Sequence, residues 1–263
     1  MLDTHLHVWD TAAVRIPWLS GAGLPATATI PDRQDRRFVL VEADAADPAE
    51  EAEWLIALAA VTPRVHGVVV SVPLERPLAA ARLAAVAEVA QVVGVRRLLQ
   101  DRDLFESPTF VDGLRRLAAC GLPFDACVRS HELPRLLTLI EQVPDLTVVL
   151  DHMGKPAVRD AAARDRWARD LARLAERDAV YCKLSGLPAE CRDADELDHF
   201  AADILDTAIA TFGVERCLIG SDSPVSQDPM GWCDRVLERL PAAEHAAVAV
   251  NNAIHVYQRS NAR

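Results

Sequence analysis

Eight short apolar runs recur along this 263-residue chain at a nearly regular interval. Their starts lie 25 to 37 residues apart, which is close to the length of one strand followed by one helix. Most runs are apolar on both faces, as expected for a parallel sheet that helices cover. We therefore expect strands at residues 2–8, 38–44, 65–72, 94–100, 122–128, 147–152, 180–186 and 217–222.

Alanine-rich amphipathic segments separate these runs. They predict helices at Pro48–Val61, Pro77–Val92, Pro108–Cys120, Leu133–Val143, Asp165–Arg177 and Asp195–Phe212. Three of the helices begin with proline, which is common in the first turn. Eight strand–helix units favour a single-domain (β/α)8 TIM barrel of the α/β class that covers residues 1–263. An open doubly wound sheet is the alternative, but no glycine-rich nucleotide loop follows the first strand.

Charge and composition exclude several classes of partner. The formal net charge of −11 argues against nucleic acid and against an anionic membrane surface. No apolar run is long enough to span a membrane, and the first strand leaves no room for a signal peptide. The six cysteines form no Cys-x-x-Cys pair, so we expect them to be reduced and mostly buried. These features indicate a cytoplasmic protein with a small-molecule substrate. Assembly into a homo-oligomer is left open.

A long irregular segment follows the first strand. Residues 10–37 contain three prolines and two glycines and match no helix or strand pattern. A loop of that length in a barrel more often covers a site than fills space. Trp18 lies in this segment, and it is a candidate for an apolar wall of a pocket or for the core.

Histidines and an aspartate stand at the expected strand ends. His5 and His7 are two residues apart on the first strand, so their imidazoles share one face. His152 ends the sixth strand and Asp222 ends the eighth. Active sites of these barrels lie at the carboxyl ends of the strands. We therefore expect these four residues to converge on one site.

The chain resembles the amidohydrolase superfamily, in particular its branch of sugar-lactone and pyrone-dicarboxylate lactonases. The resemblance covers essentially the whole length, and the combination of segments is specific to this branch. The matching segments are residues 3–10 (DTHLHVWD), 17–19 (PWL), 94–100 (GVRRLLQ), 121–129 (GLPFDACVR), 150–156 (LDHMGKP), 181–187 (YCKLSGL) and 219–225 (IGSDSPV).

The resemblance implies a role for each member of the cluster. His5, His7 and His152 would bind a divalent metal, or would hold a lactone carbonyl directly without one. Asp222 would complete the metal site, deprotonate the attacking water and protonate the leaving alkoxide. Three imidazoles and a carboxylate favour zinc. The fourth strand carries no lysine for a bridging carbamate, so we expect at most one metal.

Five further residues are candidate substrate contacts: Arg129, Lys183, Arg96, His131 and Trp18. The alternative for the charged ones is pairing with barrel carboxylates such as Asp125 or Glu42, since buried charges need partners. Only two lysines occur beside 26 arginines, Lys155 and Lys183, and both lie on or just after expected strands. These two places either need a compact ammonium or hold lysine by chance.

Three positions depart from the pattern of the branch. Arg97 and Ser223 stand where relatives often have histidine and tryptophan, and Ser130 followed by His131 stands where histidine is frequent. The departures leave the identity of the lactone open. We expect a hydrolase that opens the ring ester of a small lactone, with a sugar-acid lactone favoured. The alternatives are a metal-dependent decarboxylase, a lactone isomerase, or a barrel that binds a ligand without turnover.

Overall fold

Eight parallel strands follow one another around one sheet in their order along the chain. The computed structural model describes residues 1–258. Each predicted strand coincides with one observed strand, although most observed strands are shorter. The strands are β1 (Leu2–Leu6), β4 (Arg37–Val41), β5 (Val65–Ser71), β6 (Val92–Leu98), β7 (Phe124–Cys127), β8 (Val148–Leu150), β9 (Val180–Leu184) and β10 (Cys217–Ile219).

The residues that follow β10 close the sheet against β1. The N–H of Asp222 donates to the carbonyl of His5 at 2.8 Å, and the N–H of His7 donates to the carbonyl of Ser223 at 2.9 Å. A parallel bridge joins Leu6 and Ser223 at the same place. The sheet is therefore the predicted (β/α)8 barrel and not an open doubly wound sheet.

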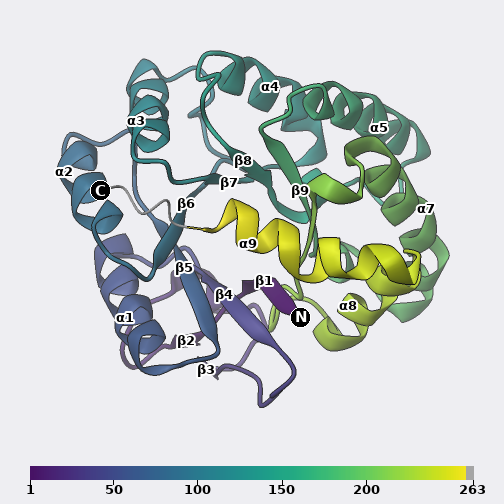
Figure 1. Ribbon diagram of the computed structural model, residues 1–263, viewed down its shortest axis with the longest axis horizontal. Coiled ribbons are helices and arrows are strands. Elements are labelled where there is room, and N and C mark those ends of the chain that lie inside the picture. The colour runs from purple at the N-terminus through teal and green to yellow at the C-terminus, as the bar shows by residue number, and fades with distance from the viewer. Residues whose placement is uncertain (259–263) are drawn as a thin grey trace.

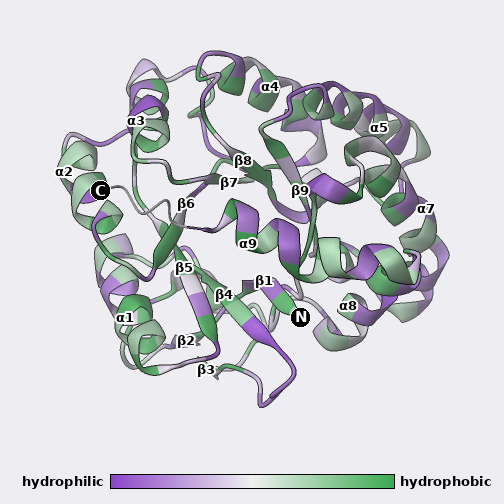
Figure 2. Cartoon of the chain, in the orientation of Figure 1, coloured by the Kyte–Doolittle hydropathy of each residue, from purple (hydrophilic) through white to green (hydrophobic). Residues whose placement is uncertain are grey.

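Helices cover the outer face of the barrel (Figure 1). In Figure 2 most of them change between green and purple along their length, as expected for amphipathic helices with one face on the strands. The six predicted helices are all present, whereas α6, α8 and α9 were not predicted. The helices are α1 (Pro48–Val61), α2 (Ala79–Ala87), α3 (Pro108–Ala119), α4 (Leu133–Glu141), α5 (Ala161–Ala175), α6 (Leu187–Glu190), α7 (Ala194–Phe212), α8 (Pro229–Glu238) and α9 (Asn252–Val256).

Local capping explains where the first outer helices begin. Asp47 precedes α1 and its carboxylate accepts the N–H of Ala49 at 2.9 Å. Ser107 caps α3 in the same way. Pro48 and Pro108 occupy the first turn, where a missing N–H costs nothing. Sequence signals of this kind therefore fix the loop lengths at the carboxyl ends of the strands.

Helix α9 closes the amino-terminal end of the barrel. In Figure 1 it runs across the opening that the strands enclose. Ala253 and Val256 of α9 belong to the same buried cluster as Leu2, whose other members include strand residues from around the barrel. Tyr257 follows α9, is fully buried, and donates its hydroxyl to an Asp125 carboxylate oxygen at 2.8 Å. The end of the chain thus supplies the floor of the barrel.

The irregular segment after β1 contains a small ribbon. Strand β2 (Trp9–Asp10) pairs antiparallel with β3 (Thr27–Ala28), and a short 3-10 turn, η1 (Pro17–Leu19), lies between them. Within residues 1–258, none of the helices combines the length and apolar character that crossing a membrane requires. All six cysteines are free thiols and five of them are buried, which confirms the prediction of burial.

Replacing Tyr257 by phenylalanine tests the barrel floor. The Tyr257→Phe variant removes a buried hydroxyl from Asp125, and we expect it to lower the free energy of unfolding by about 1–3 kcal/mol. Urea unfolding followed by circular dichroism measures this change. Tyr181→Phe is the matched control, because Tyr181 is partly exposed and should change the free energy by less than about 0.5 kcal/mol. Equal effects of the two variants would contradict the role of the buried hydroxyl.

Candidate active site

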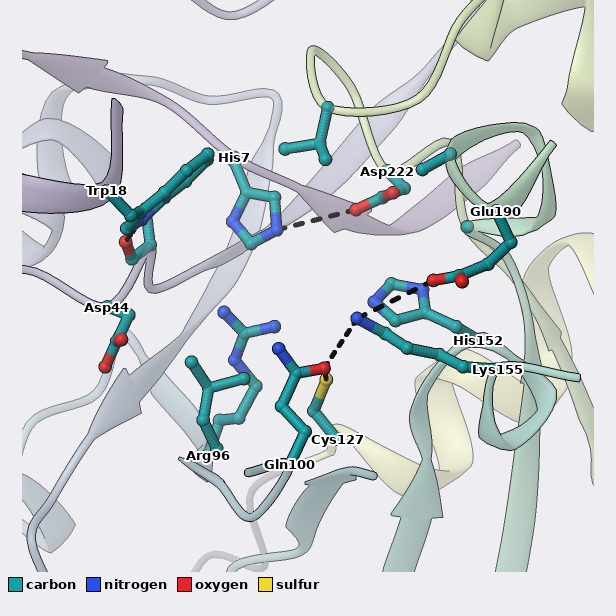
Figure 3. Close-up of a pocket in the computed structure, with 15 residues that line it drawn as sticks. His7, Trp18, Asp44, Arg96, Gln100, Cys127, His152, Lys155, Glu190 and Asp222 are labelled. Atoms are coloured by element: carbon teal, nitrogen blue, oxygen red, sulfur yellow. Dashed lines mark hydrogen bonds and ion pairs between the residues drawn. The ribbon is translucent and has the colours of Figure 1, made fainter. Parts of the chain in front are cut away.

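A cavity of about 320 Å³ lies at the carboxyl ends of the barrel strands. In Figure 3 the side chains of His7, His152 and Asp222 point into the same space, with Arg96 and Gln100 on the opposite side. Residues on or after seven of the eight barrel strands, all except β5, contribute to the wall. The polar and aromatic side chains that line it are His7, Trp18, Asp44, Arg96, Gln100, Cys127, His152, Lys155, Glu190 and Asp222.

His5 and His7 present their Nε2 atoms to each other and to Asp222. The two Nε2 atoms are 3.2 Å apart, and they lie 3.7 Å and 3.6 Å from the same Asp222 carboxylate oxygen. The Nδ1 of His7 is 2.9 Å from the carbonyl of Val41. A carbonyl only accepts, so this Nδ1 carries the proton and the Nε2 of His7 offers a lone pair. Burial lowers the pKa of His5 well below its ordinary value, although Asp151 opposes this, so the ring is neutral.

Asp222 is fixed by its backbone and by one hydroxyl. It adopts a left-handed φ of 56°, and its second carboxylate oxygen accepts the Ser226 hydroxyl at 2.8 Å. Burial raises the pKa of Asp222, but His152, His7 and His5 outweigh burial and hold that pKa below its ordinary value. Asp222 is therefore an ionised carboxylate at neutral pH.

Asp3 holds the two sides of the site in register. One of its carboxylate oxygens accepts the N–H of His5 at 3.1 Å and the N–H of Ser221 at 2.9 Å. Asp3 is fully buried, so water does not compete for these hydrogen bonds. Sequence reasoning missed this residue as a structural support, although it stands two places before His5 in the segment that carried the resemblance.

His152 enters the site from the 3-10 turn η3 (Asp151–Gly154) that follows β8. Its backbone is left-handed with a φ of 55°, and its Nδ1 lies 2.9 Å from the Ser185 hydroxyl. Burial lowers the pKa of His152 to about 4, so the ring is neutral at pH 7. A Cβ on Gly186 would stand 2.3 Å from this Nδ1, so only glycine leaves room for the ring.

A network of buried charges lies beneath His5. Lys183 is fully buried and contacts carboxylate oxygens of Asp125 at 2.7 Å and Asp151 at 2.9 Å. Burial lowers the pKa of Lys183, but the two carboxylates outweigh burial and raise it above its ordinary value. Burial raises the pKa of Asp125 to about 6 against the opposing effect of Lys183. Lys183 is therefore an ammonium, as buried ion pairs require.

The site carries an excess of negative charge that suits a divalent cation. Two buried cations face four buried carboxylates, which are Arg96 and Lys183 against Glu42, Asp125, Asp151 and Asp222. Glu51 does not add to the excess at neutral pH, because burial and the charge of Glu42 raise its pKa to about 8. The donor atoms of His5, His7 and Asp222 all lie within 4.8 Å of one another, and neutral imidazole and carboxylate are ligands that zinc prefers. The residues present therefore fit a single divalent metal.

Known proteins share this architecture. A protein-family model described as amidohydrolase matches residues 2–259. The chain belongs to the amidohydrolase family. An L-fucono-1,5-lactonase of Burkholderia multivorans is 31% identical over 97% of this chain and 95% of that protein. Two crystal structures of an amidohydrolase from Burkholderia multivorans, with bound HEPES and with bound zinc, superpose with TM-scores of 0.87 and 0.86 at 30% identity, covering 98% of this chain and 99% of theirs.

The cavity wall of this amidohydrolase contains only part of the predicted set of substrate contacts. Trp18 and Arg96 line the cavity, whereas three other predicted contacts do not. Arg129 is directed to Asp101, with N–O distances of 2.7–3.1 Å, and His131 is exposed on the adjoining turn. Lys183 lies beneath the site and pairs with carboxylates, which was the alternative given for it. The structure therefore places none of these three residues in the cavity lining, and Lys183 and Arg129 are held by carboxylates instead.

The cavity wall also contains side chains that sequence reasoning did not assign to the substrate. Lys155 donates to the Gln100 side chain at 2.7 Å and lies 3.9 Å from a Glu190 carboxylate oxygen (Figure 3). The rarity of lysine drew attention to Lys155 in the sequence. Glu190 was not identified, because it lies on α6, a helix of four residues that is too short to show a periodic pattern. Arg97, one of the departures from the branch, pairs with Glu75 at 2.6 Å and does not line this cavity.

Substituting Gly186 tests how His152 is placed. Gly186→Ala puts a methyl group against a buried ring and also strains a backbone with a φ of +69°. We expect a loss of about 2–4 kcal/mol in the free energy of unfolding, from overpacking and backbone strain together. Gly21→Ala is the control, because its φ is +89° and no atom lies within 4 Å of the added Cβ. If both variants lost the same stability, the contact with His152 would carry none of the effect.

Proposed function

We propose that this amidohydrolase hydrolyses the ring ester of a small sugar-acid lactone. The observation that carries the proposal is the ionised carboxylate of Asp222, held beside His5 and His7 in the cavity wall. The similarity to an L-fucono-1,5-lactonase over nearly the whole chain supports the same reaction. A cavity of about 320 Å³ accommodates a single sugar-sized ring.

Asp222 supplies the base that lactone hydrolysis needs. Its carboxylate takes a proton from water as the water oxygen bonds to the carbonyl carbon of the lactone. The bond between that carbon and the ring oxygen then breaks. The proton held by Asp222 passes to the departing ring oxygen, so the product is an open-chain hydroxy acid and Asp222 is again ionised.

His152 and Arg96 can stabilise the negative charge that develops on the carbonyl oxygen. In the metal-free site the Ser185 hydroxyl can donate to Nδ1 of His152, which leaves Nε2–H to donate to the substrate. Arg96 is held by Glu42 and is only 3% exposed. Donors in such a buried place stabilise an oxyanion more than they would in water, and they need no reorganisation.

A divalent metal would be held by Nε2 of His5, Nε2 of His7 and a carboxylate oxygen of Asp222. When bound, zinc would polarise the carbonyl and lower the pKa of water. We include His152 as a further ligand, as the resemblance implies, although its donor atoms group with those of His5 and Asp151. The zinc-containing structure of the Burkholderia multivorans amidohydrolase supports a divalent metal in this fold.

Replacing Asp222 tests the general base. We expect Asp222→Asn to lower kcat by about 10²- to 10⁴-fold while the affinity for a non-hydrolysed lactone analogue changes little. Acid release in weak buffer and calorimetric titration measure the two quantities. Ser226→Ala is the control, because it removes only the hydroxyl that orients Asp222 and should cost much less. Wild-type turnover in Asp222→Asn would refute the proposed role.

A panel of lactones with and without chelator tests the reaction class and the metal. We expect acid release from sugar-acid lactones, a lower rate after chelation and recovery on addition of zinc, since the donor set suits that ion. A lactone isomerase would convert the substrate without releasing acid, and a decarboxylase would release carbon dioxide. Either outcome would overturn the proposed hydrolysis.

Because Lys155 lines the cavity and Arg129 does not, we expect Lys155 rather than Arg129 to contact the substrate, and one variant of each tests this. Lys155→Met removes a donor from the cavity wall, and we expect kcat/KM to fall by roughly 5- to 100-fold, the effect of about 1–3 kcal/mol. Arg129→Gln should change kcat/KM less than about twofold, because Arg129 binds Asp101 outside the cavity lining. The reverse order of effects would restore Arg129 as the substrate contact.

A further inference from the structure

Each ring nitrogen of His5 faces one hydrogen-bond donor and one acceptor. At Nδ1 the donor is the Lys183 ammonium at 3.2 Å, and an Asp151 carboxylate oxygen that accepts no hydrogen bond lies 3.3 Å away. At Nε2 the donor is Nη1 of Arg96 at 3.5 Å and the acceptor is Nε2 of His7 at 3.2 Å. Both tautomers of the neutral ring therefore have a donor and an acceptor within 3.5 Å of the ring nitrogens.

The contacts favour the tautomer with the proton on Nε2. In that form His5 donates to His7 and accepts from Lys183, both at 3.2 Å. The neutral ring of His7 accepts at Nε2 when its Nδ1 donates to the carbonyl of Val41. The other tautomer relies on the contacts at 3.3 Å and 3.5 Å, which are weaker.

A metal at Nε2 requires the other tautomer. A metal needs the Nε2 lone pair, so the proton of the neutral ring must stand on Nδ1, where Asp151 accepts it. We propose that His5 exchanges tautomers when a divalent metal binds, with Nδ1 changing its partner from Lys183 to Asp151. One proton leaves Nε2 and one arrives at Nδ1, so the ring stays neutral and the protons balance.

This exchange gives Lys183 and Asp151 a positioning role. Both are fully buried, and both contact Nδ1 of His5, so the change of partner requires no change of rotamer. Asp125 holds Lys183 from the other side at 2.7 Å and keeps the ammonium in place when Nδ1 turns to Asp151. The same histidine can thus serve as a hydrogen-bond donor without metal and as a ligand with it.

Histidine tautomers in the wild-type protein provide the test. Protein labelled with ¹⁵N-histidine is freed of metal with a chelator, and the proton on each ring is located by two-bond ¹H–¹⁵N correlation before and after addition of zinc. His5 is assigned from the signals lost in His5→Gln. We expect Nε2–H without metal and Nδ1–H with zinc. Nδ1–H in both states would overturn the exchange.

Two variants separate the partners of Nδ1. In metal-free Lys183→Met the donor is gone and Asp151 remains, so we expect His5 to adopt Nδ1–H without zinc. Asp151→Asn should weaken zinc binding by about 10- to 100-fold, measured by competition with a chromophoric chelator. Tyr257→Phe is the matched control, because Tyr257 contacts the same network through Asp125 and should leave the His5 tautomer unchanged.

The wild-type spectra test the tautomer exchange even if Lys183→Met fails to fold. Only the zinc arm rests on the proposed metal site, since the metal-free tautomer is measured without substrate or activity. A protein that shows Nε2–H and also hydrolyses no lactone would refute the proposed function and leave this assignment of partners intact. A Lys183→Met protein that retains Nε2–H would overturn the role of Lys183.

Discussion

The two backbone hydrogen bonds that join the end of β1 to the residues after β10 are the constraint on which the site depends. They close the barrel and, in the same step, bring Asp222 beside His5 and His7. Asp3 reinforces the junction by accepting an N–H from each side. Barrel closure and assembly of the site are thus one structural event, because residues more than 200 positions apart meet only when the last strand is in place.

Below this junction, the barrel contains charge where an ordinary barrel core contains aliphatic layers. Lys183, Asp125 and Asp151 are all fully buried, and such a network is expensive unless every member has a partner. The network supports His5, because Lys183 and Asp151 both contact its Nδ1 from below. Aliphatic packing resumes toward the amino ends of the strands, where Leu2 and Val39 pack with α9. The polar layer is therefore confined to the level directly beneath the reacting groups.

The strand–helix alternation predicted the barrel, all eight strands and six helices, because hydrophobic periodicity records burial directly. The predicted strands are too long at their carboxyl ends. At three of these ends Asp44, His152 and Asp222 adopt left-handed backbone conformations, which a pattern of apolar residues does not predict. The four converging residues were found because strand ends share one edge. The direction of long side chains was not predictable: Arg129 follows β7 and Lys183 lies on β9, yet Arg129 turns outward to Asp101 and Lys183 pairs with carboxylates beneath the site.

The floor of the barrel has a consequence for how the protein is made. Tyr257, at the end of the described chain, bonds to Asp125, and α9 covers the interior beside β1. Because β1 precedes β10 and α9 by more than 200 residues, it pairs with its second neighbour and gains its cover only after those elements have been synthesised. Such long-range pairing slows folding and leaves partly formed sheets exposed. Nascent barrels that lack α9 should therefore be the species that chaperones bind, because the strand with His5 is unpaired on one side until β10 and α9 are in place.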